Sequence, residues 1–293
     1  DEAMNLKNRY LMSETEYKSG FNDALNQEWM WGYSCTIDDN LPAYNFYFKD
    51  TTTPGSYYSC LNVDPYFKDL FEDNDYRKDM LYWGPNAGYG EWIMLNSKFK
   101  FADIDNMLAD LVLMRVSEMY LIKAEAAAHL AGKTSEAQSL LKELRDARMK
   151  AGYTAAEVTA TGDDLLKEIW LERRKELWGE GFALTDIIRN QQPVERKAWT
   201  HTVECNYETD ANGNVTSKTP IVTESGDVIL ADDKDKEYRD KYCVILQGHS
   251  TVTLPDGTDF VPNSKYYLFR ITEQEELQNL NLYNDHPKLD IYR

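Results

Sequence analysis

The stretch LERRKELWGEGFALTDIIR, from Leu171 to Arg189, places three consecutive basic residues between acidic, aliphatic and aromatic ones. The chain of 293 residues has 50 Asp and Glu against 32 Lys and Arg, so its formal net charge is −18. A field of this sign repels phosphate backbones, and nucleic acid is not expected as a partner. A charge network inside a helical core therefore explains the basic cluster better than a nucleic-acid-binding surface does.

Two segments before this stretch predict a helical hairpin. Residues 108–131 contain good helix formers without Gly or Pro, and they are apolar on most sides, which predicts a helix buried on most sides. Residues 135–150 repeat apolar residues at i, i+3, i+4 and i+7. The pair has the length and composition of a tetratricopeptide unit. A third helix should begin near Asp163, behind an acidic first turn, and end at Gly179 or Gly181.

Charged residues lie on faces of these helices that are otherwise apolar. An unpaired buried ion costs several kcal/mol, so such charges must pair with one another. We therefore predict a structural charge clamp between the helices, with the arginines paired to the carboxylates. Its predicted members are Arg115, Glu118, Glu125, Glu172 and Arg173. A solvated helix face with i,i+4 ion pairs remains the alternative, chiefly for the neighbouring Arg174 and Lys175.

The remaining segments are less regular. Residues 1–106 are rich in aromatic residues, Asn, Asp and Gly, and short apolar runs such as Tyr44–Phe48 predict strands or extended loops. Asn-Gly and Asp-Gly turns in residues 209–218 and 254–260 predict two β-hairpins. Residues 210–215 also resemble a calcium loop, but the later bidentate carboxylate is missing, so a hairpin turn is favoured. We expect a mainly α fold with long irregular loops and short β-hairpins.

Cysteine and histidine spacing gives no indication of a metal site. The four cysteines form no Cys-x-x-Cys pair, and the four histidines lack ligand spacing. Cys205 and Cys243 could form a disulfide across a hairpin or remain free buried thiols. No cofactor motif, catalytic motif or run of 18 apolar residues is present. Because the chain starts within a structural pattern, we expect a mature or truncated form.

Aromatic residues on loops are candidates for carbohydrate binding, because sugar rings stack their C–H faces on them beside polar groups that bind the hydroxyls. The segment LYWGPNAGYGEW, residues 81–92, places three rings among Gly and Pro, which predicts an exposed loop. The candidate ligand-binding residues are Trp83, Tyr89, Trp92 and Asn86, followed by Tyr57 and Tyr58. The alternative is that these rings fill space between the loop and the helices. Of Trp29 and Trp31, which alternate on a predicted strand, one should be core, and neither is assigned to ligand.

The segments LMRVSEMYLIKAEAAAHL (113–130), AQSLLKELRDAR (137–148) and LLKEIWLERRKELWGEG (165–181) together resemble the SusD/RagB family, the surface glycan-binding lipoproteins of Bacteroidota. NQEWMWGY (26–33) is similar to the family's Glu-x-x-Trp-Gly strand entry. Similarity continues in residues 66–79 and in the C-terminal motif through Phe269, Ile271, Glu275 and Asn279. Arg270 and Thr272 replace the family's usual prolines, and Ala183, Leu184 and Thr185 replace an Arg and aromatic residues. Ligand specificity therefore does not transfer with the resemblance.

The resemblance implies a SusD-like α-α superhelix around the tetratricopeptide-like hairpin. Residues 1–293 would form the C-terminal part of such a protein, with a loop-rich region (1–106), a helical core (107–190) and hairpins with a tail packing back on the core (191–293). It implies a non-catalytic protein of the outer-membrane surface, held there by an N-terminal lipid anchor that this chain lacks. Such a protein delivers an oligosaccharide to a SusC-like TonB-dependent transporter. A tetratricopeptide-type protein-binding scaffold and a glycoside hydrolase remain the alternatives.

Overall fold

The computed structural model describes most of the chain. The described residues are 10–39, 44–54, 62–86, 90–231, 235–251, 253–254, 257 and 259–262. The chain forms two compact units, of which the first contains Asp1–Glu180 and Trp199–His249 and the second contains Gly181–Ala198 and Ser250–Arg293. The predicted C-terminal region, residues 191–293, is therefore divided between the two units.

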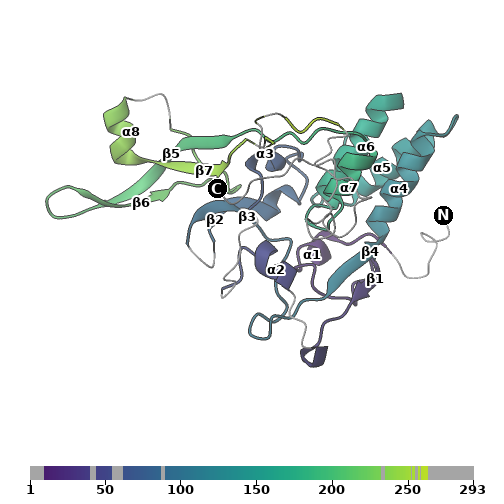
Figure 1. The fold of residues 1–293 in the computed structure, drawn as a ribbon, viewed down its shortest axis with the longest axis horizontal. Coiled ribbons are helices and arrows are strands. Elements are labelled where there is room, and N and C mark those ends of the chain that lie inside the picture. Colours follow the sequence, from purple (N-terminus) through teal and green to yellow (C-terminus); the bar gives the residue numbers. More distant parts are fainter. Residues whose placement is uncertain are drawn as a thin grey trace, which may run out of the picture. The chain divides into compact units, whose positions relative to one another are not determined.

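The three longest helices of the described chain lie in the first unit and are α4 (Val116–Ala128), α5 (Thr134–Asp146) and α6 (Gly162–Glu176). Helix α4 packs against both α5 and α6 (Figure 1). Helix α5 buries the apolar stripe that its spacing predicts, which consists of Ala137, Leu140, Leu141 and Leu144. Two aspartates occupy the first turn of α6, where carboxylates interact favourably with the helix dipole. The predicted helical hairpin is thus present, whereas a superhelix of tetratricopeptide units around it stays a prediction.

The first helix is shorter than the sequence predicted. Leu111–Arg115 forms strand β4, which pairs antiparallel with β1 (Trp29–Tyr33). A short run rich in Leu and Val can form either a helix or a strand. Here the hydrogen bonds that β1 offers stabilise the strand. The expectation of burial on most sides holds within α4, where only Ile122 and Ala126 are exposed.

Within the described residues the strands form three small antiparallel sheets. Beside the β1–β4 pair, a hairpin joins β2 (Leu81–Pro85) and β3 (Trp92–Asn96). The third sheet has the order β6 (Val215–Pro220), β5 (Trp199–Thr209) and β7 (Cys243–His249), and α8 (Lys236–Tyr242) packs beside β5 and β7 (Figure 1). The described part therefore contains more strand than the prediction of a mainly α fold implied.

The turn between β5 and β6 confirms the predicted hairpin at residues 209–218. The Asp210 carboxylate accepts hydrogen bonds of 2.9 Å from the backbone N–H groups of Asn212 and Asn214. Gly213 supplies a φ of 82°, a left-handed conformation that favours glycine. The carboxylate thus orders the turn itself, as a hairpin requires. The other predicted hairpin, at residues 254–260, lies partly outside the described residues.

Short helices interrupt the loop-rich region. They are α1 (Glu14–Tyr17), α2 (Tyr44–Lys49) and α3 (Pro65–Lys68), with 3-10 turns η2 at Ile37–Asp39 and η3 at Lys78–Met80. The strand or extended loop predicted for Tyr44–Phe48 is wrong, because these residues lie in α2. The helix places Phe46 and Lys49 three residues apart on one face, where Phe46 is buried and the Lys49 ammonium lies 4.5 Å from the Phe99 ring centroid.

Aromatic side chains fill much of the interior of the first unit. Tyr17 and Phe21 meet edge to face with ring centroids 4.9 Å apart, and Phe99 lies 5.9 Å from the Phe21 ring. Gly179, directly after α6, has a φ of 77° and approaches the Phe99 ring so closely that a Cβ would lie 2.4 Å from Cε2. Only glycine fits at this position, which accounts for the Trp-Gly pair after α6.

The structure resolves the state of three cysteines. Cys205 and Cys243 are buried and Cys35 is partly buried, none of these three is in a disulfide, and Cys60 lies outside the described residues. Burial raises the pKa of Cys205, whose Sγ donates to the Tyr242 carbonyl at 2.8 Å. The disulfide considered for Cys205 and Cys243 is therefore wrong.

In the second unit, the described residues contain α7 (Ala183–Arg189) and an antiparallel bridge between Val194 and Phe260. Asp186 and Arg189 form an ion pair of 2.7 Å along the helix. Among the described residues of the whole chain, we find no helix that combines the length and apolar character needed to span a membrane.

Candidate functional site

The segment predicted as an exposed aromatic loop, residues 81–92, is in large part a β-hairpin. Trp83 pairs with Met94 across the two strands, and its side chain is only 4% exposed. Its ring lies 4.7 Å from that of Trp199 on β5. The proposed role of Trp83 as an exposed stacking platform is therefore wrong, and the alternative that this ring fills the interior holds. Strand pairing, which the glycines of the segment do not prevent, turns the ring inward.

The other candidates of this segment have different environments. Trp92 is half-buried at the turn end of the hairpin, opposite Pro85. Asn86 is 6% exposed, and its Oδ1 accepts the Gly90 N–H at 3.1 Å, so this amide orders the turn. Tyr89, like Tyr57 and Tyr58, lies outside the described residues. Ligand binding by Trp92 and these three tyrosines stays a prediction.

A more exposed pair of aromatic side chains lies on β1. Trp31 is 63% exposed and Tyr33 is 39% exposed, whereas Trp29 is 2% exposed and belongs to the core. The prediction that one of the two strand tryptophans is core is confirmed. The sequence analysis assigned the other to no ligand. Strict alternation would place Trp29 and Trp31 on the same face, and the register irregularity between them accounts for their opposite exposure.

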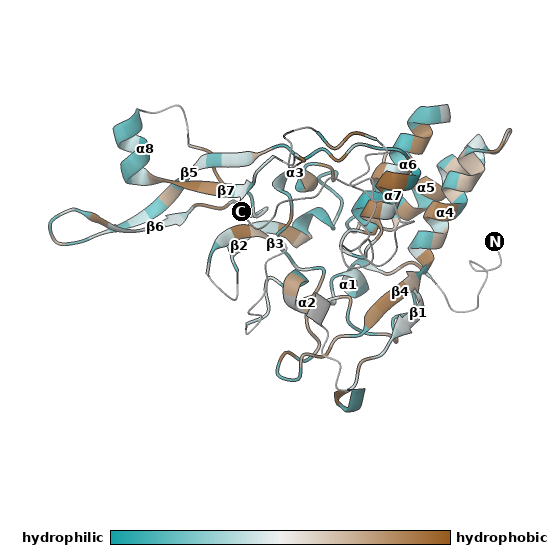
Figure 2. Ribbon diagram, viewed as in Figure 1, coloured by the Kyte–Doolittle hydropathy of each residue, from teal (hydrophilic) through white to brown (hydrophobic). Residues whose placement is uncertain are grey.

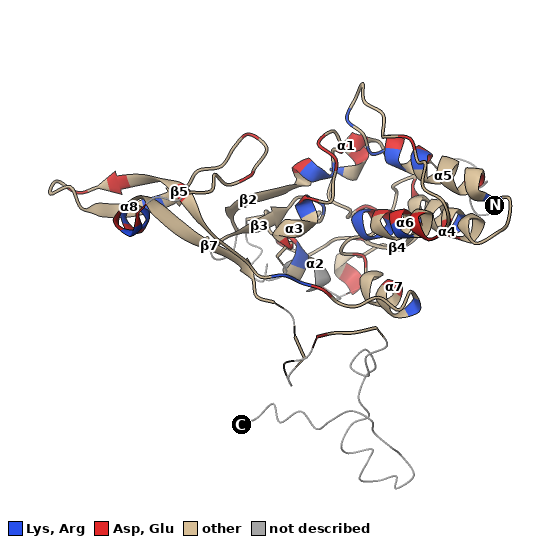
Figure 3. Cartoon of the chain, turned by 90° about the horizontal axis from the view of Figure 1, so that it is seen from above, with Lys and Arg blue, Asp and Glu red and all other residues tan. Residues whose placement is uncertain are grey.

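A buried ion network is centred on Glu176, near the end of α6. Glu176 Oε1 accepts hydrogen bonds from Arg115 at 2.6 Å and Arg148 at 2.8 Å, and Oε2 accepts from Arg77 at 2.7 Å and Arg148 at 3.0 Å. The Glu176 main-chain carbonyl accepts from Lys98 at 3.0 Å. Acidic and basic residues occur together along α6 (Figure 3). A single carboxylate thus connects three guanidinium groups that come from three separate segments.

Arg115, a predicted clamp member, is buried and paired, as expected. Its guanidinium donates to Glu28, Ser117, Glu176 and Glu180. These bonds use Nε and both Nη atoms of Arg115. Its carboxylate partners are therefore Glu28, Glu176 and Glu180 rather than the expected Glu118 and Glu125. Glu118 is half-buried, and Glu125 is buried and accepts a hydrogen bond of 3.1 Å from Trp170.

Glu172, one turn before Glu176, is a second carboxylate of the network. It accepts from Arg77 at 2.7 Å and Lys175 at 2.9 Å, and it is fully buried. Arg173 is 5% exposed and Lys175 is 7% exposed, so the solvated-face alternative is wrong for both, while Arg174 is exposed. The basic cluster of the opening stretch is therefore mainly interior.

Sequence reasoning missed several members of the network, namely Glu28, Asp75, Arg77, Arg148 and Glu180. Arg148 had a usable signal, because it continues the buried stripe of α5 four residues after Leu144. Glu28 directly precedes the core residue Trp29 and could also have been suspected. Asp75 and Arg77, which pair at 2.6 Å, lie in an irregular segment without periodicity, so nothing in the sequence places them inside.

The network perturbs the acidity of its members. Burial alone would raise the pKa of Glu172, but Arg77, Lys175 and Arg145 together hold this pKa well below its usual range. Burial likewise opposes ionisation of Glu176 and Glu180, and the neighbouring arginines outweigh it, so both pKa values are lowered. Burial lowers the pKa of Lys98 to about 8, in spite of its 2.6 Å pair with Glu180. The carboxylates are therefore held ionised.

These lowered pKa values predict a loss of stability in acid. An unfolded Glu titrates near pH ~4.3, whereas Glu172, Glu176 and Glu180 must be protonated at a lower pH in the folded state. Their stabilising contribution is fully present above the unfolded pKa and is lost as pH falls toward the folded values. Urea unfolding should give a nearly constant free energy from about pH 7 to 5 and a steep decline below about pH 4.5. A flat profile down to about pH 3 would show that the network adds no pH-dependent stability.

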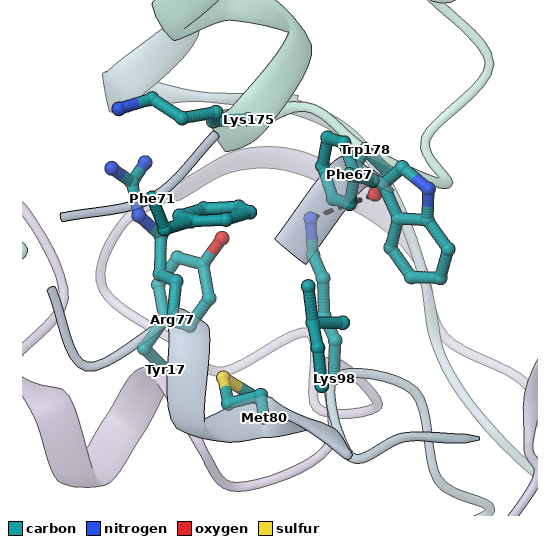
Figure 4. Close-up of a pocket in the computed structure, with 9 residues that line it drawn as sticks. Tyr17, Phe67, Phe71, Arg77, Met80, Lys98, Lys175 and Trp178 are labelled. Atoms are coloured by element: carbon teal, nitrogen blue, oxygen red, sulfur yellow. Dashed lines mark hydrogen bonds between the residues drawn. The ribbon is translucent and has the colours of Figure 1, made fainter. Parts of the chain in front are cut away.

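Figure 4 shows a small pocket beside this network, with Arg77, Lys98 and Lys175 among its lining residues. The aromatic side chains of Tyr17, Phe67, Phe71 and Trp178 also line it. The three cations pair with carboxylates in the structure, Lys98 with Glu180 and the other two with Glu172. Their charge is thus already neutralised, and we assign no anionic ligand to this pocket. Within the described residues no group of three His, Cys, Asp or Glu side chains could hold a metal ion.

The sequence pattern of the SusD family matches residues 86–284, which is more than half of the chain. The chain therefore belongs to the SusD family, as its helical and charged segments predicted.

Individual relatives agree with this assignment. The solved structure of a SusD-like carbohydrate binding protein from Bacteroides vulgatus ATCC 8482 is 47% identical, with a TM-score of 0.73 over 98% of this chain and 54% of that chain. A SusD superfamily protein from the same organism shares the fold at 23% identity, with a TM-score of 0.51 over 67% of this chain and 44% of that chain. SusD-like protein P38 of Formosa agariphila is 30% identical over 155 residues, which are 46% of this chain and 29% of P38. The chain thus spans about half the length of the solved relatives and less of the curated one.

Proposed function

We propose that this protein is a non-catalytic glycan-binding protein of the outer-membrane surface, which passes its ligand to a SusC-like TonB-dependent transporter. The observation that carries the proposal is the likeness to the carbohydrate binding protein of Bacteroides vulgatus, at 47% identity over nearly the whole chain. Lipid anchoring and transporter partnership follow from the family resemblance and are part of the same proposal.

The carboxylates of the buried network argue against a hydrolase. A glycosidase needs one carboxyl group with a raised pKa as its general acid and a second carboxylate beside the substrate. Glu28, Glu172 and Glu176 are instead fully buried and paired with arginines, and the pKa values of Glu172 and Glu176 are lowered. The densest carboxylate cluster of the described chain therefore serves stability rather than acid catalysis.

A protein-binding scaffold is the second candidate. Its support is the exposure of Ile122 at 47% and of Leu130 at 58%, which leaves apolar side chains of the α4 segment open. This surface fits a role in contacting the transporter, so protein binding and glycan binding are compatible on different faces.

Glycan binding is expected to be direct and without turnover. A glycan array should show binding of the intact protein to neutral oligosaccharides, because the net charge of −18 disfavours acidic polysaccharides. Calorimetric titration with the selected glycan should then show saturable heat, and a reducing-sugar assay should show no release. Binding to no glycan would favour the scaffold, and release of reducing sugar would establish a hydrolase.

A further inference from the structure

The exposed face of the β1–β4 sheet has the composition of a sugar-stacking surface. All seven tryptophans lie in the described residues, and Trp31 is the only one that is largely exposed, at 63%. Tyr33, two residues further along β1, is 39% exposed. Exposed aromatic area of this size costs free energy in water and is more readily retained where a ligand covers it. The buried Trp83 cannot serve in this way.

Backbone geometry places the two rings on the same side of the strand. Residues i and i+2 share a face of a regular β-strand and lie about 7 Å apart. The pairing with β4 is irregular between Trp31 and Gly32, but burial along β1 still alternates there, with Trp31 and Tyr33 exposed on either side of the less exposed Gly32. The intervening Gly32 faces inward, because a Cβ added to it would lie 3.0 Å from the ring of the buried Trp29. Across the sheet, Met114 pairs with Trp31 and is 36% exposed. Figure 2 shows the hydrophobic colouring of β4 beside β1. Trp31 and Tyr33 therefore present a short row of rings with an apolar border.

Hydrogen-bonding groups border the same rings. Asp39, at the end of the 3-10 turn η2, lies close to Tyr33, because burial and then the Asp39 carboxylate raise the pKa of the Tyr33 hydroxyl. The backbone N–H and hydroxyl of Thr36 donate to Asp39 Oδ2 at 2.7 and 2.9 Å, which holds this carboxylate in place. Asp39 is exposed. A fixed, exposed carboxylate close to Tyr33 can accept hydrogen bonds from sugar hydroxyls.

We propose that Trp31 and Tyr33 form the stacking platform for successive sugar rings of a neutral oligosaccharide, with Asp39 accepting hydroxyl hydrogen bonds. The inference rests on the proposed glycan-binding function and names the surface that performs it. Asp38 and Asp39 together place negative charge at this surface, which disfavours uronic or sulfated sugars.

Calorimetric titration with the array-selected neutral oligosaccharide tests the platform. Trp31→Ala should weaken binding by about tenfold or more, and Trp31→Phe should recover part of the loss because a ring remains. The control is Tyr153→Ala, which removes an aromatic side chain that is 54% exposed outside β1. Trp92→Ala tests the competing hairpin position. Circular dichroism should be unchanged in all four variants, since none of these side chains is fully buried.

The outcomes separate the platform from the proposed function. If the intact protein binds and Trp31→Ala binds within about twofold of it, the platform is overturned while glycan binding stands. If Trp92→Ala alone loses binding, the hairpin is the platform instead. If the intact protein binds no neutral glycan, both proposals are overturned.

A second measurement needs no variant. N-bromosuccinimide should oxidise Trp31 before the other tryptophans, and peptide mapping by mass spectrometry should show that the glycan slows this reaction selectively. Oxidation of Trp31 at an unchanged rate under saturating glycan would overturn the platform. Protection that rises with protein concentration in the absence of sugar would show that a second copy of the chain covers this face, and it would overturn the assignment as well.

Discussion

Replacement of Glu176 by glutamine should destabilise the protein by about 3–5 kcal/mol, because it leaves buried arginines without a compensating charge. The carboxylate oxygens lie 2.6–3.0 Å from donors of Arg77, Arg115 and Arg148, and Glu176 is 0% exposed. Glutamine keeps the size of the side chain, so the change isolates the charge. Urea unfolding of the variant and of the unaltered protein measures the difference in free energy.

Glu168→Gln is the matched control for this experiment, since it removes a carboxylate from the same helix. The Glu168 side chain is 37% exposed, and it forms an ion pair of 2.9 Å with Arg145. Exposed pairs contribute at most about 1 kcal/mol, so the control should shift stability by no more than that. Equal effects of the two substitutions would mean that the Glu176 network has no special energetic weight.

Leu144→Ala should cost about 2–5 kcal/mol, because it removes buried methyl groups and leaves a cavity. Leu144 is 0% exposed on α5, and Leu121 of the adjoining α4 is 1% exposed. Both were predicted to lie in the core of the helical hairpin, and both are buried. Thermal and urea unfolding, with the slope of the urea transition checked for two-state behaviour, would measure the loss.

The control for this substitution is Leu130→Ala, which makes the same chemical change after the end of α4. Leu130 is 58% exposed, so its truncation should alter stability by less than about 0.5 kcal/mol. A loss at Leu144 as small as the loss at Leu130 would contradict the packing of α5 against α4.

The helical part of the fold could be predicted because its signals are local. The spacing of Ala137, Leu140, Leu141 and Leu144 is a property of consecutive residues, and so is the acidic first turn of α6. The segment around Trp29 and Trp31 was likewise predicted to be a strand, although the register irregularity between these residues, which separates the inner ring from the outer one, has no local signal. The burial of Arg173 and Glu172 followed from the apolar character of their surroundings in the sequence.

The exposure of individual rings could not be predicted in the same way. Trp83 and Trp31 are both tryptophans on short strands, yet one stacks on Trp199, more than a hundred residues away, and the other has no such cover. The carboxylate partners of Arg115 could not be predicted either, because Glu28 and Glu180 are distant from it in the chain and no periodicity connects them.

The family, the helical hairpin, the interior position of the charged stretch and the β1 strand could be predicted from the chain alone, because helix and strand patterns and charge within apolar faces are properties of neighbouring residues. The folded structure was needed to show which arginine meets which carboxylate, that residues 81–85 form a strand, and which tryptophan faces water. Those outcomes depend on contacts between segments far apart in the chain, where strand pairing and the desolvation of charges select one arrangement from several that local sequence permits equally.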